Sequence, residues 1–247
     1  MSGTFERHIR LQGAFNVRDL GGYARAGGGT TRWRSVLRAD GLQGLTPADV
    51  ATLLDLGLVT VIDLRSHVEL ARDPSAFAKH AHVDYRHIPL FDSLAPVDQL
   101  LASSASFGLA ERYASAADLC GPALGRVATT VAEAGDGVVL FNCTAGKDRT
   151  GIVAAMLLSL AGVADDEIVA DYALTATVGA VLMDRLRQAA KARGLSETAA
   201  ATLLGSEPDT MRAFLRHVAG RHGGFAAYLA GTGLSPDMLD RLVRRLG

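Results

Sequence analysis

The central segment of the chain reads Val138-Val139-Leu140-Phe141-Asn142-Cys143-Thr144-Ala145-Gly146-Lys147-Asp148-Arg149-Thr150-Gly151. Its four consecutive apolar residues, 138–141, are typical of a parallel strand that is buried on both faces. Further apolar residues then recur at the spacing of one helix face, and they are Ile152, Val153, Met156, Leu157 and Leu160. The pattern predicts a strand, a tight loop and the start of a helix.

The loop between strand and helix has the composition of an anion site. Successive N–H groups from Thr144 to Arg149 can converge at the positive end of the helix and cradle an anion. A thiolate at Cys143 would be stabilised by that helix end and by Arg149, which predicts a nucleophile at neutral pH. Five residues separate Cys143 from Arg149, so the loop can wrap once around a tetrahedral anion while the guanidinium clamps two oxygens.

Two other interpretations of the loop are weaker. A nucleotide-binding Walker loop needs glycine at the position of Phe141 and serine or threonine at the position of Asp148, so that interpretation fails. A buried structural cysteine is the commoner role for this residue type. It would not, however, require the surrounding arginine, glycine and helix start.

The length of 247 residues allows one large domain or two small ones. Because no linker, repeat or low-complexity tract divides the chain, we predict one domain, residues 1–247. Hydrophobic residues make up 49% of the chain and the net charge is −1, which argues against a nucleic-acid partner or a polybasic membrane contact. No segment reaches the roughly 20 apolar residues of a membrane span, and residues 1–7 lack the apolar core of a secretory signal. We therefore expect a cytoplasmic protein, with leaderless secretion as the alternative.

The two cysteines and seven histidines show no metal-ligand spacing, so the sequence predicts neither a disulfide framework nor a metal site. Cys120 is most simply a small buried hydrophobe. The alternative is a resolving thiol for an oxidised Cys143.

The remaining chain alternates strand and helix patterns. Residues 15–37 predict a β-hairpin, and 46–57 a helix with Thr46 as its cap. A strand follows at 59–64, a capping box at 66–69 opens the next helix, and 83–90 form another strand. Further helices are predicted after the central loop. This pattern is typical of an α/β fold with a mostly parallel sheet flanked by helices. Residues 93–118 are either a helical lid or a peripheral helix pair.

Several strings occur in the order found in a known family: Asn16 to Tyr23, Leu45 to Asp49, Ile62 to Ser66, Ile88 to Asp92, Cys143 to Gly151 and Val169 to Tyr172. Together they resemble the bacterial tyrosine phosphatase family, which includes dual-specificity and phosphoinositide phosphatases. The similarity spans residue 14 to the C-terminus. It implies a protein tyrosine phosphatase-like fold.

The resemblance also implies an activity, namely hydrolysis of phosphomonoesters without metal or organic cofactor. The expected substrates are phosphotyrosine proteins or peptides, with phosphoserine, phosphothreonine and phosphoinositides as further candidates. Cys143 would form a phosphocysteine and Thr150 would hydrogen-bond the sulfur. The phosphate would be held by the loop residues, which are Thr144, Ala145, Gly146, Lys147, Asp148 and Arg149.

Two aspartates are candidates for the general acid that protonates the leaving oxygen. Asp92 follows a strand at the edge of the sheet where α/β proteins place their ligands. Asp148 lies inside the loop, and we favour it slightly. Lys147 is expected to supply a second cation beside the cradle, whereas Arg18, Asp19, Asp63 and Arg65 are expected to form structural ion pairs.

One residue departs from the family pattern, because Asn142 stands where histidine usually precedes the cysteine. An amide can donate a hydrogen bond but cannot carry charge. A phosphate-binding module without turnover is therefore the alternative function. A sulfur or arsenate transferase is disfavoured because the motif has five intervening residues instead of four.

Overall fold

Strand β5 (Val138–Asn142) lies at the centre of the sheet, as its apolar run predicts. The computed structural model describes residues 6–92 and 108–247 of the chain. β5 is buried along its whole length and pairs in parallel with β2 (Val36–Ala39) and with β3 (Leu58–Asp63). Because both of its faces are covered, neither face needs polar residues.

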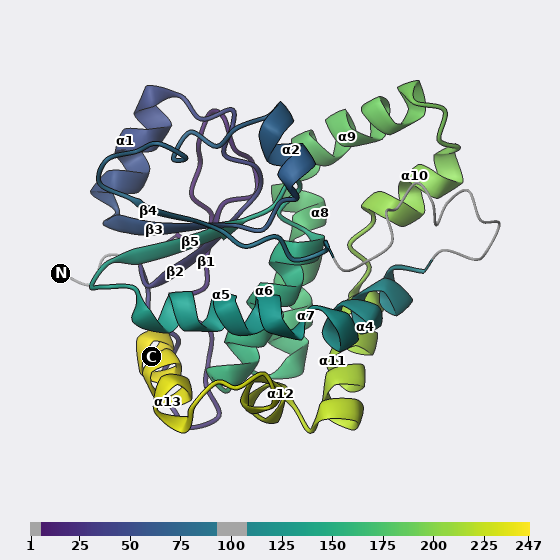
Figure 1. Cartoon of the computed structure of the whole chain (residues 1–247). Helices are drawn as coiled ribbons and strands as arrows, with labels where there is room; N and C mark the ends of the chain where they lie inside the picture. Colours follow the sequence, from purple (N-terminus) through teal and green to yellow (C-terminus); the bar gives the residue numbers. More distant parts are fainter. Residues whose placement is uncertain (1–5, 93–107) are drawn as a thin grey trace.

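The strands form one mixed sheet in the order β1-β2-β5-β3-β4 (Figure 1). β4 (Asp84–His87) is a parallel edge strand, and β1 (Arg18–Asp19) runs antiparallel to β2 at the other edge. The segment from β1 to β2 turns at residues 25–29. The predicted hairpin and the mostly parallel sheet are thus both confirmed.

Helices cover both faces of the sheet, and the layers differ in thickness (Figure 1). Val139 and Phe141 of β5 face the larger apolar core, whereas Val138 and Leu140 face the smaller one with α1 (Pro47–Asp55) and the N-terminal segment. The helices around the larger core are α4 (Leu109–Leu119), α5 (Gly121–Glu133), α6 (Asp148–Leu160), α7 (Asp165–Ala173), α11 (Pro208–His222), α12 (Phe225–Gly231) and α13 (Pro236–Leu246).

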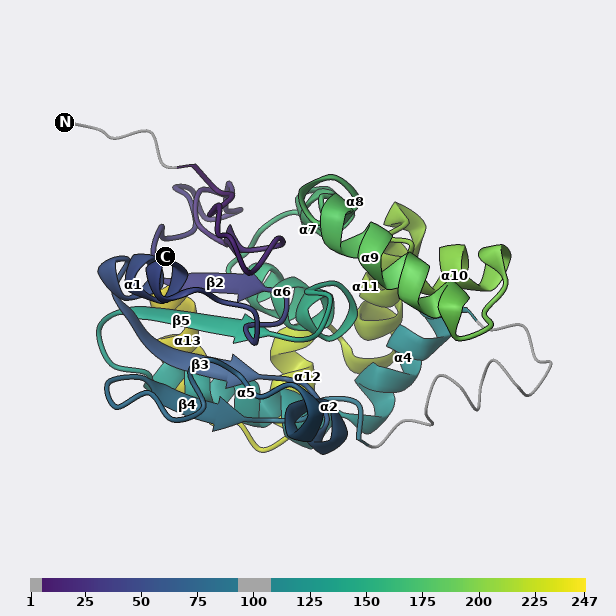
Figure 2. The ribbon, with the colours of Figure 1, turned by 90° about the horizontal axis from the view of Figure 1, so that it is seen from above.

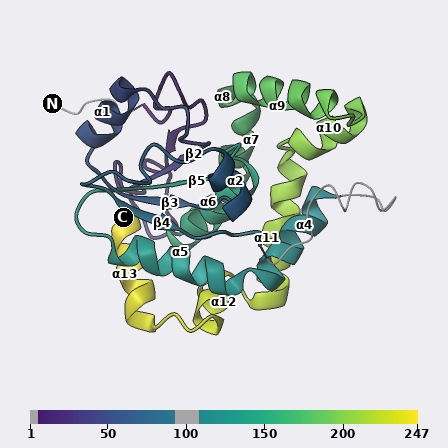
Figure 3. The same ribbon diagram turned by 45° about the horizontal axis from the view of Figure 1, so that its top comes forward.

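The carboxyl edge of the parallel strands is surrounded by helices. Figure 2 shows these strands pointing toward α2 (His67–Arg72), α4 and a helical extension. That extension consists of α8 (Thr175–Val178), α9 (Ala180–Ala192) and α10 (Glu197–Leu204), and Figure 3 shows it leaving α7 and returning to α11. Within the described part of the chain, no helix is long and apolar enough to cross a bilayer.

The predicted lid segment, residues 93–118, falls into two parts. Residues 93–107 lie outside the described residues. The remainder belongs to α4, whose buried residues Leu109, Tyr113, Ala116 and Ala117 are part of the larger core. This part of the segment is therefore a helix that packs on the larger core.

A buried ion cluster joins β1 and β2 to α7. The carboxylate of Asp171 accepts a hydrogen bond from Arg38 and one of 2.9 Å from the Tyr23 hydroxyl, and it lies 3.5 Å from Arg18 Nε. Burial would raise the pKa of Asp171, but the charges of Arg38 and Arg18 outweigh it and lower the pKa to about 2. The charges are thus paired across three elements.

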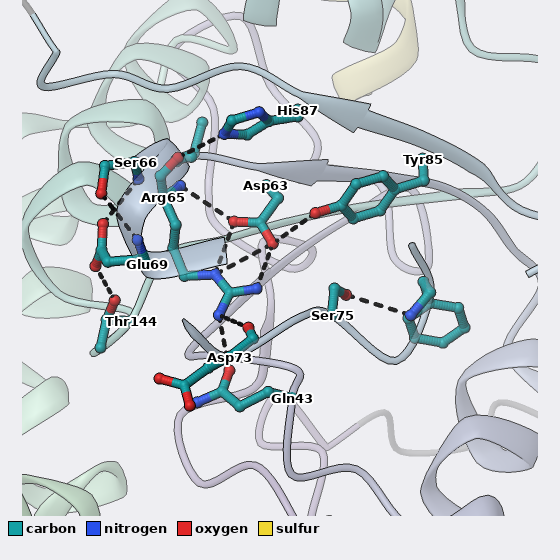
Figure 4. Close-up of polar contacts among 12 residues, drawn as sticks. Gln43, Asp63, Arg65, Ser66, Glu69, Asp73, Ser75, Tyr85, His87 and Thr144 are labelled. Atoms are coloured by element: carbon teal, nitrogen blue, oxygen red, sulfur yellow. Dashed lines mark hydrogen bonds and ion pairs between the residues drawn. The ribbon is translucent and has the colours of Figure 1, made fainter. Parts of the chain in front are cut away.

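The other expected ion pairs are also confirmed. Asp19 pairs with Arg34 at 3.3 Å, and Asp63 with Arg65 at 2.7 Å. Figure 4 shows that the Arg65 guanidinium also donates to Gln43 and to the Asp73 carbonyl. It therefore ties the end of β3 to the segment before α1 and to the end of α2.

Candidate active site

The loop after β5 occupies the carboxyl edge of the sheet, with Cys143 at its start and Asp148 as the first residue of α6. Two of its backbone carbonyls accept hydrogen bonds from side chains that lie outside the loop. Asn16 Nδ2 donates to the carbonyls of Ala145 and Gly146, at 3.1 Å each, and Arg38 Nη2 donates to Gly146 at 2.7 Å. Since a trans peptide points its N–H opposite to its C=O, the N–H groups of residues 146 and 147 face away from these donors. They can therefore bind an anion enclosed by the loop.

Gly146 allows this loop to pack closely on the sheet. Its φ is +65°, and an added Cβ would lie 2.8 Å from the Asp40 nitrogen and 2.9 Å from the Ala39 carbonyl oxygen. Both the conformation and the space therefore require glycine. Below it, the buried Asp40 carboxylate accepts hydrogen bonds from the Phe15 and Asn16 amides, and burial raises its pKa to about 6.

Cys143 is a free cysteine that is 2% exposed, at the point where the strand enters the loop. The preceding Asn142 is fully buried, and neither its amide nitrogen nor its amide oxygen has a hydrogen-bond partner among the described residues. An unpaired buried amide costs stability. Asn142, which stands where the family usually has histidine, therefore carries this cost, because no hydrogen bond from the described residues offsets the burial of its side-chain amide.

Arg149 is anchored by Glu69 of α2, a residue that the sequence analysis treated only as part of a capping box. Arg149 Nη1 donates to Glu69 Oε2 at 2.6 Å, and Nη2 donates to Oε1 at 2.8 Å. Glu69 also accepts hydrogen bonds from the Ser66 amide and the Thr144 hydroxyl (Figure 4). Burial would raise the pKa of Glu69, but Arg149 outweighs this effect and holds the pKa well below its usual range.

The carboxylate of Asp148 lies at the mouth of the loop and is held by α4. Its Oδ1 accepts a 2.7 Å hydrogen bond from the Tyr113 hydroxyl, which also lies 3.1 Å from the Tyr172 hydroxyl. Burial would lower the pKa of Arg149, but the hydrogen bonds with Glu69 outweigh this effect, and the charges of Cys143, Glu69 and Asp148 raise the pKa further. Asp148 and Cys143 therefore both lie within electrostatic reach of the same guanidinium.

Lys147 lies elsewhere than the sequence analysis expected. Its side chain is fully buried, and Nζ donates to the carbonyls of Leu203 at 2.6 Å and Gly205 at 2.9 Å, at the end of α10. Nζ is also 3.3 Å from Asp148 Oδ1. The lysine thus ties the loop to the helical extension instead of presenting a free cation to a ligand.

Thr150 makes a different contact from the expected one, and Asp92 is exposed. The buried Thr150 hydroxyl donates to the Ala39 carbonyl at 3.3 Å, so its proton is directed at the sheet in this structure. Asp92 is an exposed turn residue whose charge acts on Cys120. Burial, with a contribution from Asp92, raises the pKa of the Cys120 thiol to about 11, which argues against Cys120 as a reactive resolving thiol.

An aromatic ring and a second cation lie beside Arg149. Its guanidinium carbon is 5.8 Å from the centre of the Phe91 ring, and that of Arg112 is 5.0 Å from the same ring. Arg112 comes from α4, and burial and the charge of Arg149 lower its pKa. No sequence pattern marked Arg112, because a lone arginine on an amphipathic helix is usually a solvated residue.

Comparisons with known proteins agree with the motif. The model of the tyrosine phosphatase family matches residues 9–247. A tyrosine-protein phosphatase of Nostoc commune is 34% identical over 223 aligned residues, covering 85% of this chain and 74% of that protein. The triple specificity protein phosphatase PtpB of Mycobacterium tuberculosis is 29% identical over 273 aligned positions, covering 94% of this chain and 96% of that protein.

A third relative, from Cupriavidus necator, is provisionally named as a tyrosine-protein phosphatase. It is 35% identical over 162 aligned residues. The match covers 64% of this chain and 59% of that protein.

Proposed function

The chain belongs to the tyrosine phosphatase family, and on that premise we propose that it hydrolyses phosphomonoesters through a covalent intermediate on Cys143. The Cys143 thiolate attacks phosphorus, an S–P bond forms and the bond from phosphorus to the leaving oxygen breaks. Water then attacks the phosphocysteine, which releases inorganic phosphate and restores the thiolate. The observation that carries the proposal is that Asn16 and Arg38 bind the carbonyls of Ala145 and Gly146, so that the N–H groups of residues 146 and 147 point away from these donors and can bind phosphate oxygens.

Charge stabilisation in this scheme comes from the loop amides and Arg149. The guanidinium is held by Glu69 before substrate binds, so little reorganisation is needed as negative charge develops on the equatorial oxygens. Because the Nη atoms bond Glu69, we infer that the phosphate uses the Nε side of the guanidinium.

Asp148 is the residue we assign as general acid. Its carboxyl group would protonate the leaving oxygen in the first step and take a proton from the attacking water in the second. The Tyr113 hydroxyl bond supports this role, because it orients the carboxyl group at the start of α6. Glu69 is unsuited to the role, since Arg149 keeps it ionised.

Phosphotyrosine is the substrate we infer first. The Phe91 ring beside Arg149 can contact the aromatic ring of a phosphotyrosine whose phosphate occupies the loop. Phosphoserine, phosphothreonine and phosphoinositides are the further substrates that we propose, and the position of Arg112 beside the Phe91 ring places a second cation near the site, where it would favour phosphoinositides with more than one phosphate. The triple specificity of the Mycobacterium tuberculosis relative makes this wider range worth testing.

The test measures phosphate release from a phosphotyrosine peptide, a phosphoserine peptide and phosphoinositide vesicles, with chelator present. We expect wild type to act on the phosphotyrosine peptide and Cys143→Ser to lose turnover on all three. Cys120→Ser is the matched control and should retain the activity. Phosphate binding without turnover by wild type would instead favour the phosphate-binding module. The observation in its support is that the side-chain amide of Asn142 has no hydrogen-bond partner among the described residues.

A further inference from the structure

Two histidines and an aspartate from distant parts of the chain meet on the surface formed by α4 and α11. Asp118 Oδ1 lies 3.0 Å from His217 Nε2 and 3.0 Å from His222 Nε2. These three atoms all lie within 4.8 Å of one another. The sequence distance between α4 and α11 explains why no metal-ligand spacing was visible in the sequence.

The ligand atoms are held in place by their neighbours. The Tyr228 ring packs edge-on against the His222 ring, with the ring centres 5.0 Å apart. The hydroxyl of the same tyrosine donates a 2.7 Å hydrogen bond to the carbonyl of Ala117, the residue before Asp118. Tyr228 therefore fixes both the imidazole and the backbone that carries the carboxylate, as outer-shell residues do in metal sites.

The electrostatics of the cluster favour a cation. Asp118 precedes the last residue of α4 and His222 is the last residue of α11, so the negative ends of two helices meet there. Arg221 Nε is 3.2 Å from Asp118 Oδ1, and its side chain is 65% exposed. This guanidinium would compete with a bound cation for the Asp118 carboxylate, and because its side chain is exposed it can move away into solvent.

We propose that Asp118, His217 and His222 bind a divalent transition-metal ion of the zinc class. Two imidazole nitrogens and one carboxylate oxygen are ligands that this class prefers, and three protein ligands leave a fourth position for water. Metal–ligand bonds of about 2.0–2.2 Å in a tetrahedron place ligand atoms roughly 3.3–3.6 Å apart. The two separations of 3.0 Å between Asp118 and the histidines need to widen by a few tenths of an ångström, and the two imidazole nitrogens lie within 4.8 Å of each other.

A metal at this position would stabilise the packing of two helices beside the active site. It would join α4 to α11, and α4 also carries Tyr113, which bonds Asp148. Phe214 of α11 packs against the Tyr113 ring with the ring centres 5.9 Å apart. Metal binding should therefore stabilise the fold by mass action and hold Tyr113 in place.

The test is a Zn²⁺ titration in competition with a chromophoric chelator. It uses the Cys143→Ser chain, which removes the active-site thiol as a competing ligand and makes the result independent of phosphatase activity. We expect one ion per chain. His217→Ala and His222→Ala should each weaken Zn²⁺ binding at least about tenfold, the lower end of the loss caused by outer-shell changes. His82→Ala, at an exposed histidine on another surface, is the control and should bind like the parent.

Arg221→Ala provides a variant that keeps all three ligands. Because it removes the competing guanidinium, it should tighten Zn²⁺ binding several-fold. Circular dichroism checks that each variant is folded. The proposal is overturned if the histidine variants bind Zn²⁺ as the His82→Ala control does, or if Arg221→Ala leaves the affinity unchanged or weaker.

Discussion

The position of Arg149 depends on one carboxylate contributed by another element. Glu69 caps α2 through the Ser66 amide and at the same time receives both Nη atoms of Arg149. Cys143 and Arg149 could be predicted from the sequence because strand, loop and helix are contiguous there. The second role of Glu69 could not be predicted, because the capping box accounts for this residue without any long-range contact.

Replacing Glu69 should therefore impair catalysis more than folding. We expect Glu69→Gln to lower kcat/KM about 10–100-fold, since a guanidinium displaced by about 1 Å loses its alignment with the phosphate. Steady-state kinetics on a small aryl phosphate measure this effect, and the melting temperature provides the comparison. Glu111→Gln on α4 is a matched control. Wild-type kinetics in Glu69→Gln would refute the anchoring role.

The two candidate acids differ in their surroundings. Asp148 is oriented by Tyr113, whereas Asp92 is exposed. We expect Asp148→Asn to lower kcat about 10²–10⁴-fold on substrates with poor leaving groups, and much less on those whose leaving oxygen needs no proton. Asp92→Asn should stay near wild type on both. A larger loss in Asp92→Asn, measured on the same pair of substrates, would exchange the two roles.

At the scale of elements, the Lys147 side chain ties the helical extension to the loop. Lys147 donates to the carbonyls of Leu203 and Gly205 at the end of α10, from which residues 205–207 lead into α11. The sequence placed Lys147 beside the anion because it precedes Asp148 and Arg149. The direction of a side chain that leaves a tight loop depends on which groups pack against that loop. For Lys147 these groups are the backbone carbonyls of residues 203 and 205, which are far away in the sequence.

Lys147→Met should loosen the end of α10. It removes two hydrogen bonds from an ammonium group, which contribute about 1.5–3 kcal/mol each when the donor is charged. Hydrogen exchange should therefore speed up in residues 197–205 while the central strand stays protected. The sequence-based alternative predicts the opposite pattern, with unchanged exchange and a raised KM for substrates that carry two phosphates.

At the scale of the whole molecule, local patterns could predict a mostly parallel sheet and the order of strands and helices along the chain. The apolar run of β5, the Thr46 cap and the Ser66 capping box each act within a few residues. The surroundings of the site could not be predicted in this way. Arg112, Tyr113 and Glu69 reach the loop from other elements, and only packing determines which side chains meet.

The buried cluster around Asp171 should contribute to the acid stability of the fold. Asp171→Asn leaves Arg18 and Arg38 without their buried counter-charge, which we expect to cost about 3–5 kcal/mol near neutral pH. Urea unfolding measures this loss. A change below about 1 kcal/mol, the range of surface ion pairs, would contradict it.

The sign of the pH dependence follows from the lowered pKa of Asp171. The unfolded carboxyl takes up its proton near its ordinary pKa of 3.8, whereas the folded one does so at about 2. The stabilisation is therefore present above 3.8 and is lost as the pH falls toward 2. We expect wild type to lose stability across this window and Asp171→Asn to show a flatter profile there.

The most direct test of the central claim is to trap the phosphorylated enzyme. Asp148→Asn, in which hydrolysis of the intermediate should be slowed, is mixed with a labelled phosphotyrosine peptide, quenched in acid and digested for mass spectrometry. We predict one phosphoryl group on Cys143 and none in the Cys143→Ser, Asp148→Asn double variant. Peptide turnover by wild type without any label on Cys143, or with the label on another residue, would contradict the thiol mechanism.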